Sequence, residues 1–287
     1  MENLQRQFLL RIFIVLISSF LFFTGCKSKI ENNSNISGET ETPDVVNVSN
    51  TTVNERYIGS NDVYKTKYFV IKGKAEFPKI IVDGGIHGDE AAGYLTCDTL
   101  VKNIKIEEGT LLVIPRLNLM ACNANVRGLK HDFNRVFPGD EKSGEYEFRL
   151  AYEFMKLIDS LKPELVLNLH EAKTKYDADN YKNNPAHGYA QTLITCITPP
   201  EPILSKVLES LNSGINKAIY KFNIQYYPIQ PNHSQDNIVS KLNIKSYTIE
   251  TYKGFDLDTR IKLQILTLLR FFDAVNIKYT YPDFRIN

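Results

Sequence analysis

Residues 80–95 have the sequence IIVDGGIHGDEAAGYL, in which an apolar strand passes through a glycine-containing bend into the start of a helix. The bend carries His87 and Glu90, two side chains of the kinds that bind metal ions. Glycines at positions 84, 85 and 88 permit the backbone angles and the close approach that such a bend requires. A lone His-x-x-Glu pair occurs by chance in many helices, and His87 alone could be an ordinary turn residue. A metal site therefore needs a further ligand from elsewhere in the chain.

Short apolar runs alternate with longer amphipathic segments from about Tyr64 onward. Strands are predicted at residues 67–72, 79–85, 110–117, 163–172, 191–198 and 245–252, and helices at residues 91–104, 146–161, 201–222 and 258–276. The pattern predicts an α/β fold built on a mixed, mainly parallel sheet with helices on both faces. No internal repeat and no second linker appear, so one domain is expected from residue 57 to residue 287.

Polar side chains follow the ends of several predicted strands. His170 and Glu171 close the strand that ends at Leu169, and Glu250 closes the strand that ends at Ile249. Ligand sites of such sheets gather at the carboxyl ends of the strands. His87, Glu90 and His170 together supply a His₂Glu set, one of the usual ligand sets of catalytic zinc, which leaves one position for water. The sequence therefore predicts a zinc site at this edge of the sheet.

Four motifs resemble, in their order along the chain, the zinc carboxypeptidase superfamily of the carboxypeptidase A type: GGIHGDEAAG (84–93), DFNRVFPG (132–139), LNLHEA (167–172) and YTIETY (247–252). This superfamily also contains the aspartoacylase and succinylglutamate desuccinylase deacylases. The resemblance extends from about residue 67 to residue 276 and implies a zinc carboxypeptidase-like fold. The segments LLVIPRLN (111–118) and VRGLKHDFNR (126–135) are most similar to bacterial peptidoglycan carboxypeptidases that determine helical cell shape. Some of those relatives carry Gln where this chain has His87.

The resemblance implies a catalytic role for three groups of residues. His87, Glu90 and His170 would bind one Zn²⁺, as their positions already suggested. Glu250 matches the general base, which takes a proton from water and passes it to the leaving amine. Arg127 lies seven residues before Asn134, a spacing similar to that of the deacylase branch, in which the arginine stabilises the oxyanion.

Other residues near these motifs would bind substrate or support the ligands. Asn134 and Arg135 match the pair that binds the terminal carboxylate of the substrate, a task that suits the planar guanidinium of arginine. Asp89 and Glu171 could orient the ligand imidazoles as hydrogen-bond acceptors, although Asp89 could equally cap the following helix. The superfamily often has a tyrosine that covers the site, and no motif decides whether Tyr226 or Tyr227 is that residue.

Composition excludes little beyond nucleic-acid binding. Hydrophobic residues make up 43% and charged residues 23% of the 287 residues, as in ordinary globular proteins. The formal net charge is only +1, and no cluster of Lys and Arg stands out beyond the extreme N-terminus. Cys97, Cys122 and Cys196 are widely spaced and odd in number, which favours core positions over a disulfide framework.

The N-terminal segment is similar to a bacterial lipoprotein signal. Arg6 and Arg11 precede an apolar run at residues 12–23, which ends in FTGC at Cys26. The prediction is a signal peptide at residues 1–25, a lipidated Cys26 and a flexible, polar tether at residues 26–56. The alternative is an uncleaved anchor helix. Either arrangement predicts a protein of the cell envelope, held at a bacterial membrane and facing the periplasm or the exterior.

Three functions remain as hypotheses. The first is a zinc carboxypeptidase that removes a C-terminal residue from peptides, with cell-wall muropeptides as the expected substrates. The second is a deacylase of N-acyl amino acids or similar small amides, which would share the zinc site and a substrate carboxylate. Deacylases of that branch are usually cytosolic, so the predicted lipid anchor favours the peptidase. The third is a binding protein with an inactive site, which the presence of every matched residue disfavours.

Overall fold

The computed structural model describes residues 52–59, 65–176, 188–227 and 233–283. The predicted signal peptide, Cys26 and the predicted tether up to residue 51 lie outside the described residues. Within the described ranges, no helix is both long and apolar enough to cross a membrane.

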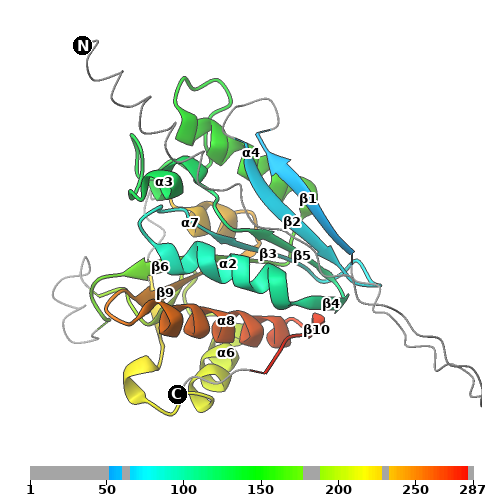
Figure 1. Ribbon diagram of the computed structural model, residues 1–287, viewed down its shortest axis with the longest axis vertical. Coiled ribbons are helices and arrows are strands. Elements are labelled where there is room, and N and C mark those ends of the chain that lie inside the picture. Colours follow the sequence, from blue (N-terminus) through cyan, green and yellow to red (C-terminus); the bar gives the residue numbers. More distant parts are fainter. Residues whose placement is uncertain (1–51, 60–64, 177–187, 228–232, 284–287) are drawn as a thin grey trace, which may run out of the picture. The chain divides into compact units, whose positions relative to one another are not determined.

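An eight-stranded mixed sheet forms the centre of the domain, in the order β1-β2-β5-β3-β6-β9-β7-β8 (Figure 1). Its strands are β1 (Thr52–Ile58), β2 (Thr66–Lys72), β3 (Lys79–Gly84), β5 (Thr110–Ile114), β6 (Leu165–Ala172), β7 (Thr192–Thr195), β8 (Asn223–Tyr226) and β9 (Lys245–Tyr252). The pairs β5–β3, β3–β6, β6–β9 and β7–β8 are parallel, whereas β1–β2, β2–β5 and β9–β7 are antiparallel. The predicted fold class is confirmed.

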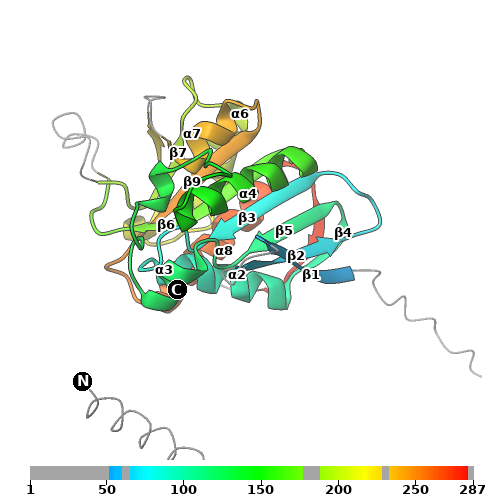
Figure 2. The ribbon, with the colours of Figure 1, turned by 90° about the horizontal axis from the view of Figure 1, so that it is seen from above.

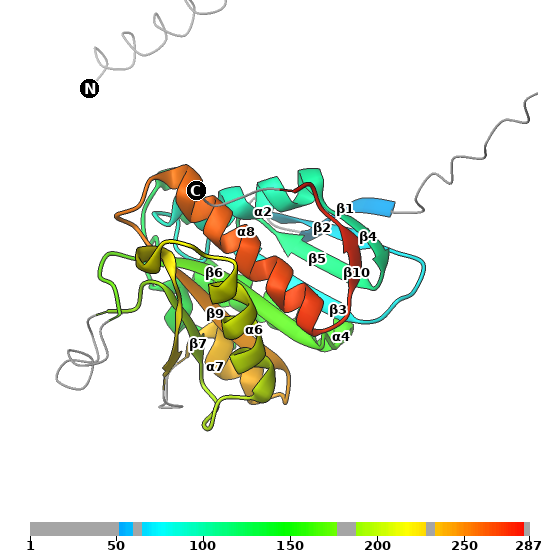
Figure 3. The ribbon, with the colours of Figure 1, turned by 90° about the horizontal axis from the view of Figure 1, so that it is seen from below.

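Helices cover both faces of this sheet. The longer helices are α2 (Ala91–Asn103), α4 (Tyr146–Leu161), α6 (Pro202–Ser213) and α8 (Leu257–Ala274), and the short ones are α3 (Leu119–Ala124) and α7 (Gln235–Ser240). The described residues also contain the 3-10 turns η1 (Phe133–Arg135) and η2 (Ala218–Tyr220). Helices α4 and α7 lie on one face (Figure 2), and α2, α6 and α8 lie on the other (Figure 3).

The two hydrophobic cores follow from the two-residue period of the strands. Ile80 and Val82 of β3 belong to the core beneath α2, α6 and α8, whereas Ile81 between them belongs to the core beneath α4. Because successive side chains of a strand point to opposite faces, one apolar run can serve both cores. The central parallel strands are therefore buried on both sides, and the ionisable side chains of His170 and Glu250 lie toward the carboxyl ends of β6 and β9.

Some elements differ from those that the sequence predicted. Strand β1 begins at Thr52, before the expected domain start at residue 57, and its side chains are exposed up to Tyr57, so it lacks the apolar alternation that identifies strands. The helix predicted over residues 201–222 ends at Ser213, and Gly214 follows. The 3-10 turn η2 occupies the end of that predicted range, and strand β8 begins directly after it, at Asn223. A small second sheet pairs β4 (Lys105–Glu108) with β10 (Lys278–Thr280), neither of which was predicted.

Two glycines of the bend after β3 have distinct structural reasons. Gly85 has φ of +70°, in the left-handed region that favours glycine. At Gly88, an added Cβ would lie only 2.0 Å from the backbone oxygen of Ala121 in α3. The bend is thus packed directly against the backbone of α3, and this contact holds His87 and Glu90 in place.

The substitution Gly88→Ala is expected to destabilise the protein by about 1–3 kcal/mol, because the added methyl group must displace the backbone of α3. Urea unfolding measures the change. Gly144→Ala is the matched control, since an added Cβ at Gly144 meets nothing within 4 Å. Equal unfolding midpoints for the two variants would contradict the close packing at Gly88.

Candidate metal centre

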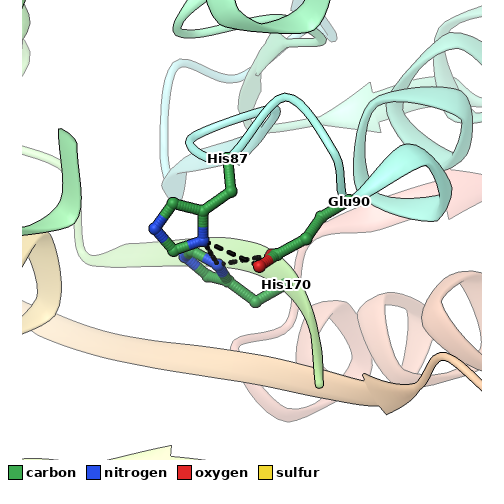
Figure 4. Close-up of side chains that lie close together, drawn as sticks. All are labelled: His87, Glu90 and His170. Atoms are coloured by element: carbon green, nitrogen blue, oxygen red, sulfur yellow. Dashed lines mark hydrogen bonds and ion pairs between the residues drawn. The ribbon is translucent and has the colours of Figure 1, made fainter. Parts of the chain in front are cut away.

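The three predicted metal ligands come together at the carboxyl ends of β3 and β6. His87 lies in the bend after β3, Glu90 is the residue before α2, and His170 lies in β6. Glu90 Oε1 is 2.8 Å from His87 Nδ1, and Glu90 Oε2 is 2.8 Å from His170 Nδ1. The two Nδ1 atoms are 3.1 Å apart (Figure 4). The candidate ligand atoms of two distant segments, the bend after β3 and strand β6, thus lie close enough together to share one metal ion.

The chemistry of this cluster fits a zinc ion. The three residues are only 1–4% exposed, and their ligand atoms all lie within 4.8 Å of one another. Two imidazole nitrogens and one carboxylate oxygen form the donor set of many catalytic zinc sites, in which the fourth position is left to water or substrate. Two bare imidazole nitrogens that face each other in a buried place are costly unless a cation or proton lies between them.

Charge within the cluster shifts the protonation of its members. Burial alone would raise the pKa of Glu90, but the neighbouring imidazoles of His87 and His170 outweigh burial and hold the pKa well below its usual range. Burial lowers the pKa of His170, more than the carboxylate of Glu90 raises it. Glu90 is therefore an anion and His170 a neutral imidazole at neutral pH, the forms in which both residues bind metal ions.

Asp132 is a functional residue that the sequence analysis did not identify. Its Oδ1 lies 3.0 Å from His87 Nε2, the ring nitrogen that faces away from the cluster. An acceptor in this position fixes the orientation of a ligand imidazole. Asp132 is the first residue of the DFNRVFPG motif, so the motif contained it, but only the folded chain brings it to His87.

The substitution Asp132→Asn should lower zinc affinity roughly 10- to 100-fold, as loss of such supporting acceptors commonly does. Competition with a chromophoric chelator measures the affinity. Asp159→Asn is the control, because Asp159 is an exposed residue of α4 that, in the described part of the chain, pairs only with Lys162. Unchanged zinc affinity in Asp132→Asn would show that Asp132 does not support His87.

The two acids proposed as supports of the imidazoles serve other purposes. Asp89 accepts a hydrogen bond from Lys253 Nζ at 3.2 Å and does not cap α2. Glu171 accepts a hydrogen bond from the backbone N–H of Ala92 at 2.9 Å and forms an ion pair with Arg260. Glu171, not Asp89, therefore satisfies the N-terminus of α2 and holds Glu90 where the helix begins.

Glu250 lies beside the ligand cluster because β9 pairs with β6 in parallel. In this register Glu250 is the partner of His170, so both side chains leave the sheet on the same face. Its Oε2 is buried and has no hydrogen-bond partner among the described residues. Burial raises the pKa of Glu250 well above its usual range, and the negative charge of Glu90 adds to this effect. Such a carboxyl group can both take up and give back a proton.

Arg127, Asn134 and Arg135 lie on the same cavity as the cluster. Arg127 donates hydrogen bonds to Asp132 Oδ2, at 3.0 Å from Nη2, and to Glu90 Oε1, at 3.4 Å from Nη1. Asn134 Oδ1 accepts from the backbone N–H of Gln235 at 2.9 Å, which leaves the Nδ2 group as the donor for a ligand. Arg135 is exposed, and its guanidinium contacts the carbonyl of Asn134.

The cavity has a volume of about 430 Å³ and joins all of these groups. Its lining includes the three ligands, Glu250, Arg127 and the Asn134–Arg135 pair. Tyr227 lines it and Tyr226 does not, so of the two tyrosines considered only Tyr227 reaches the site. Its ring packs edge-on against Tyr189, with centroids 6.1 Å apart. A volume of this size accommodates a small peptide end or an acyl amino acid.

Comparison with known proteins agrees with this geometry. Residues 76–191 match the family model of the succinylglutamate desuccinylase/aspartoacylase catalytic domain. The match covers less than half of the chain and shows that this segment is similar to that catalytic domain. The match includes His87, Glu90 and His170 but ends before Glu250. The resemblance predicted from the motifs is confirmed over the matched residues.

Individual relatives match in sequence or in structure. The N-alpha-acetyl-L-2,4-diaminobutyric acid deacetylase of Halomonas elongata is 30% identical over 109 residues, which cover 36% of this chain and 31% of that protein. The mDAP-bound form of Helicobacter pylori Csd4, a D,L-carboxypeptidase, superposes with a TM-score of 0.64 at 21% identity, over 73% of this chain and 53% of that chain. An aspartoacylase family protein from Mesorhizobium loti gives a TM-score of 0.57 at 18% identity, over 80% of this chain and 68% of that chain.

The chain thus spans about half the length of Csd4 and about a third of the length of the deacetylase. At identities below 25%, the structural matches establish the fold. They agree with the large mixed sheet and its helices. The family and its structural neighbours are hydrolytic enzymes by name: carboxypeptidase, deacetylase, desuccinylase and aspartoacylase.

Proposed function

We propose that the protein is a zinc-dependent carboxypeptidase that removes the C-terminal residue of a peptide, with peptidoglycan stem peptides as its substrates. One observation carries the proposal: the His87–Glu90–His170 cluster, the unpartnered oxygen of Glu250 and the Asn134–Arg135 pair all face one cavity. These groups provide, in turn, a metal site, a proton acceptor and a binding site for a carboxylate. The superposition on Csd4, a D,L-carboxypeptidase, supports this substrate class.

Each residue of the site has a defined part in the proposed hydrolysis. A zinc ion bound by His87, Glu90 and His170 would polarise the scissile carbonyl and lower the pKa of water. Glu250 Oε2 accepts the proton of the attacking water and later donates it to the nitrogen of the leaving amine. Arg127 donates to the oxygen of the carbonyl as negative charge develops there.

The substrate is held at its terminal carboxylate. The guanidinium of Arg135 and the Nδ2 group of Asn134 donate hydrogen bonds to this carboxylate, and the two residues are adjacent in η1. Asn134 is anchored through Gln235, so its amide is held in one orientation before substrate binds. A fixed carboxylate places the scissile bond at a constant distance from Glu250.

The alternative function is an N-acyl amino acid deacylase. The family match and the deacetylase relative favour it, since both concern acyl groups on amino acids. The same zinc ligands, Glu250 and Arg127 would serve either reaction. In both reactions the released amine carries the free carboxylate. The two hypotheses differ in the acyl side of the cleaved amide, which is the rest of a peptide in one reaction and a small acyl group in the other.

A hydrolysis assay decides between them. The zinc-loaded protein is incubated with muropeptide tri-, tetra- and pentapeptides and, separately, with N-acetyl amino acids that include N-acetyl-diaminobutyrate. Release of the C-terminal amino acid from the muropeptides alone supports the carboxypeptidase. Release of acetate alone establishes the deacylase, and failure on both sets with zinc bound contradicts a hydrolase.

We also propose that the enzyme is held at the cell envelope by a lipid on Cys26, on the basis of the apolar run at residues 12–23 and the FTGC sequence that ends it. A tether of about thirty residues would reach on the order of 30 Å from the membrane surface. In cells, Cys26→Ala is expected to abolish lipid attachment and to leave the protein in the soluble fraction. Mass spectrometry of the N-terminal peptide checks this, and an unmodified Cys26 in the wild-type protein would refute it.

A further inference from the structure

Asp236 is a buried acid on the wall of the cavity that the proposed reaction does not use. It is 4% exposed and lies in the first turn of α7. Its Oδ1 accepts a hydrogen bond from Ser234 Oγ at 2.7 Å, and its Oδ2 accepts one from Cys196 Sγ at 3.3 Å. Burial raises the pKa of the Cys196 thiol, and the negative charge of Asp236 raises it further, so the thiol stays protonated and donates.

The other acids on the cavity wall have evident purposes or cationic partners. Asp89 is paired with Lys253, and Glu171 is paired with Arg260. Glu90 belongs to the metal cluster, and Glu250 is the proposed proton acceptor. Among the described residues, Asp236 has no basic partner, and its two donors are neutral groups. A buried carboxylate without a cation is costly, so a cationic ligand group would be bound there favourably.

The position of Asp236 relates it to the substrate. The preceding residue, Gln235, donates its backbone N–H to Asn134, one of the two residues that bind the substrate carboxylate. The Gln235 side chain is in turn anchored to Asp83, with Nε2 at 2.7 Å from Oδ2. Asp236 is therefore held next to the carboxylate-binding pair. The side chain of the residue bound there by its carboxylate is the part of a substrate that can reach Asp236.

Two neutral side chains also line the same cavity. Thr248 of β9 and Ile194 of β7 are partners in the antiparallel pair of these strands, and both line the cavity. Neither can neutralise a cation or compete for one. Both oxygens of Asp236 already accept one hydrogen bond, which suits the compact charge of an ammonium group better than the two-pronged guanidinium.

We propose that Asp236 selects substrates whose carboxylate-bearing residue carries a side-chain ammonium group. That the ligand is a substrate rests on the proposed function, whereas binding of an ammonium group by Asp236 does not depend on turnover. It assigns to this chain a preference for basic amino acids at the position held by Asn134 and Arg135.

Binding of free amino acids to the zinc-loaded full chain tests the proposal by isothermal titration calorimetry. Lysine is compared with norleucine, and ornithine with norvaline, each as both enantiomers. The wild-type protein is expected to bind at least one amine about 10- to 100-fold more tightly than its neutral counterpart, the usual contribution of a hydrogen bond to a charged group. Equal affinities, or no binding at millimolar concentration, would overturn the proposal.

Variants separate charge recognition from a structural role. Asp236→Asn should lose the preference for the amine while binding the neutral amino acid as before. Asp236→Glu keeps the charge on a longer side chain and should retain a preference, shifted toward the shorter ornithine. Asp258→Asn is the matched control, since Asp258 also lies in the first turn of a helix, α8, but outside the cavity. A preference that survives in Asp236→Asn would overturn the proposal.

The outcome is distinct from that of the hydrolysis assay. An amine preference in a protein that cleaves neither muropeptides nor N-acetyl amino acids would support this inference and contradict the proposed function. Hydrolysis without any preference for the amine would support the proposed function and contradict this inference.

Discussion

Glu250→Gln is expected to leave a protein that binds zinc as the wild type does and has lost nearly all turnover. The amide cannot accept the proton of the attacking water, whereas the three metal ligands remain in place. A missing general base commonly costs about 10²- to 10⁴-fold in rate. The value of kcat on the substrate that the hydrolysis assay identifies and the zinc content of the purified variant measure the two parts of this prediction.

The exposed residue Glu209 of α6 supplies the control for this variant. Glu209→Gln makes the same chemical change outside the cavity and should leave kcat unaltered. The buried Oε2 of Glu250 has no partner in the described part of the chain, so the substitution breaks no structural hydrogen bond at that oxygen. Wild-type activity in Glu250→Gln would remove Glu250 from the mechanism and leave the cavity without an assigned base.

His170→Ala is expected to abolish zinc binding, because it removes one of the three predicted ligands and leaves Glu90 with a single imidazole. The loss of affinity should exceed the roughly 10- to 100-fold that follows removal of a supporting residue. Zinc at 100 times its dissociation constant stabilises a folded protein by about 2.7 kcal/mol. The wild-type melting temperature should therefore rise on addition of zinc, and that of the variant should not.

A second histidine distinguishes loss of a ligand from general damage to the fold. His131→Ala removes an imidazole that packs edge-on against Phe148, with ring centroids 5.1 Å apart, and that lies outside the cavity. This variant should still gain stability from zinc. A zinc-dependent rise in the melting temperature of His170→Ala, equal to that of the wild type, would mean that the ion binds elsewhere.

The strands and the zinc ligands could be predicted because both follow local rules. Buried parallel strands are continuous apolar runs, as at residues 165–169, and α4 has one apolar face, which identified its bounds as Tyr146–Leu161. In parallel strands the carboxyl ends meet at one edge, so residues that end apolar runs are brought together. His170 and Glu250 were predicted neighbours for this reason, and they are partners in the sheet.

Peripheral elements of the fold could not be predicted from the pattern of apolar residues. Strand β1 is exposed and is held by its backbone pairing with β2, so its side chains carry no apolar period. The small sheet of β4 and β10 joins segments at Lys105 and Thr280, whose pairing no local pattern indicates. Helix α7 has only six residues, too few to show a helical period, yet it carries Asp236.

The sequence by itself predicted the α/β architecture, the resemblance to the hydrolase family and the three residues of the candidate metal site, because apolar periodicity and motif order are properties of adjacent residues. The tertiary structure alone decided how the acids of the site are used. Asp132 reaches His87 across 45 residues, Asp89 pairs with Lys253 across 164, and Asp236 faces the cavity without a cation. The sequence alone does not distinguish a carboxylate that orients a ligand imidazole from one that caps a helix or binds a substrate. Its partner is set by how distant segments pack, and that partner defines its function.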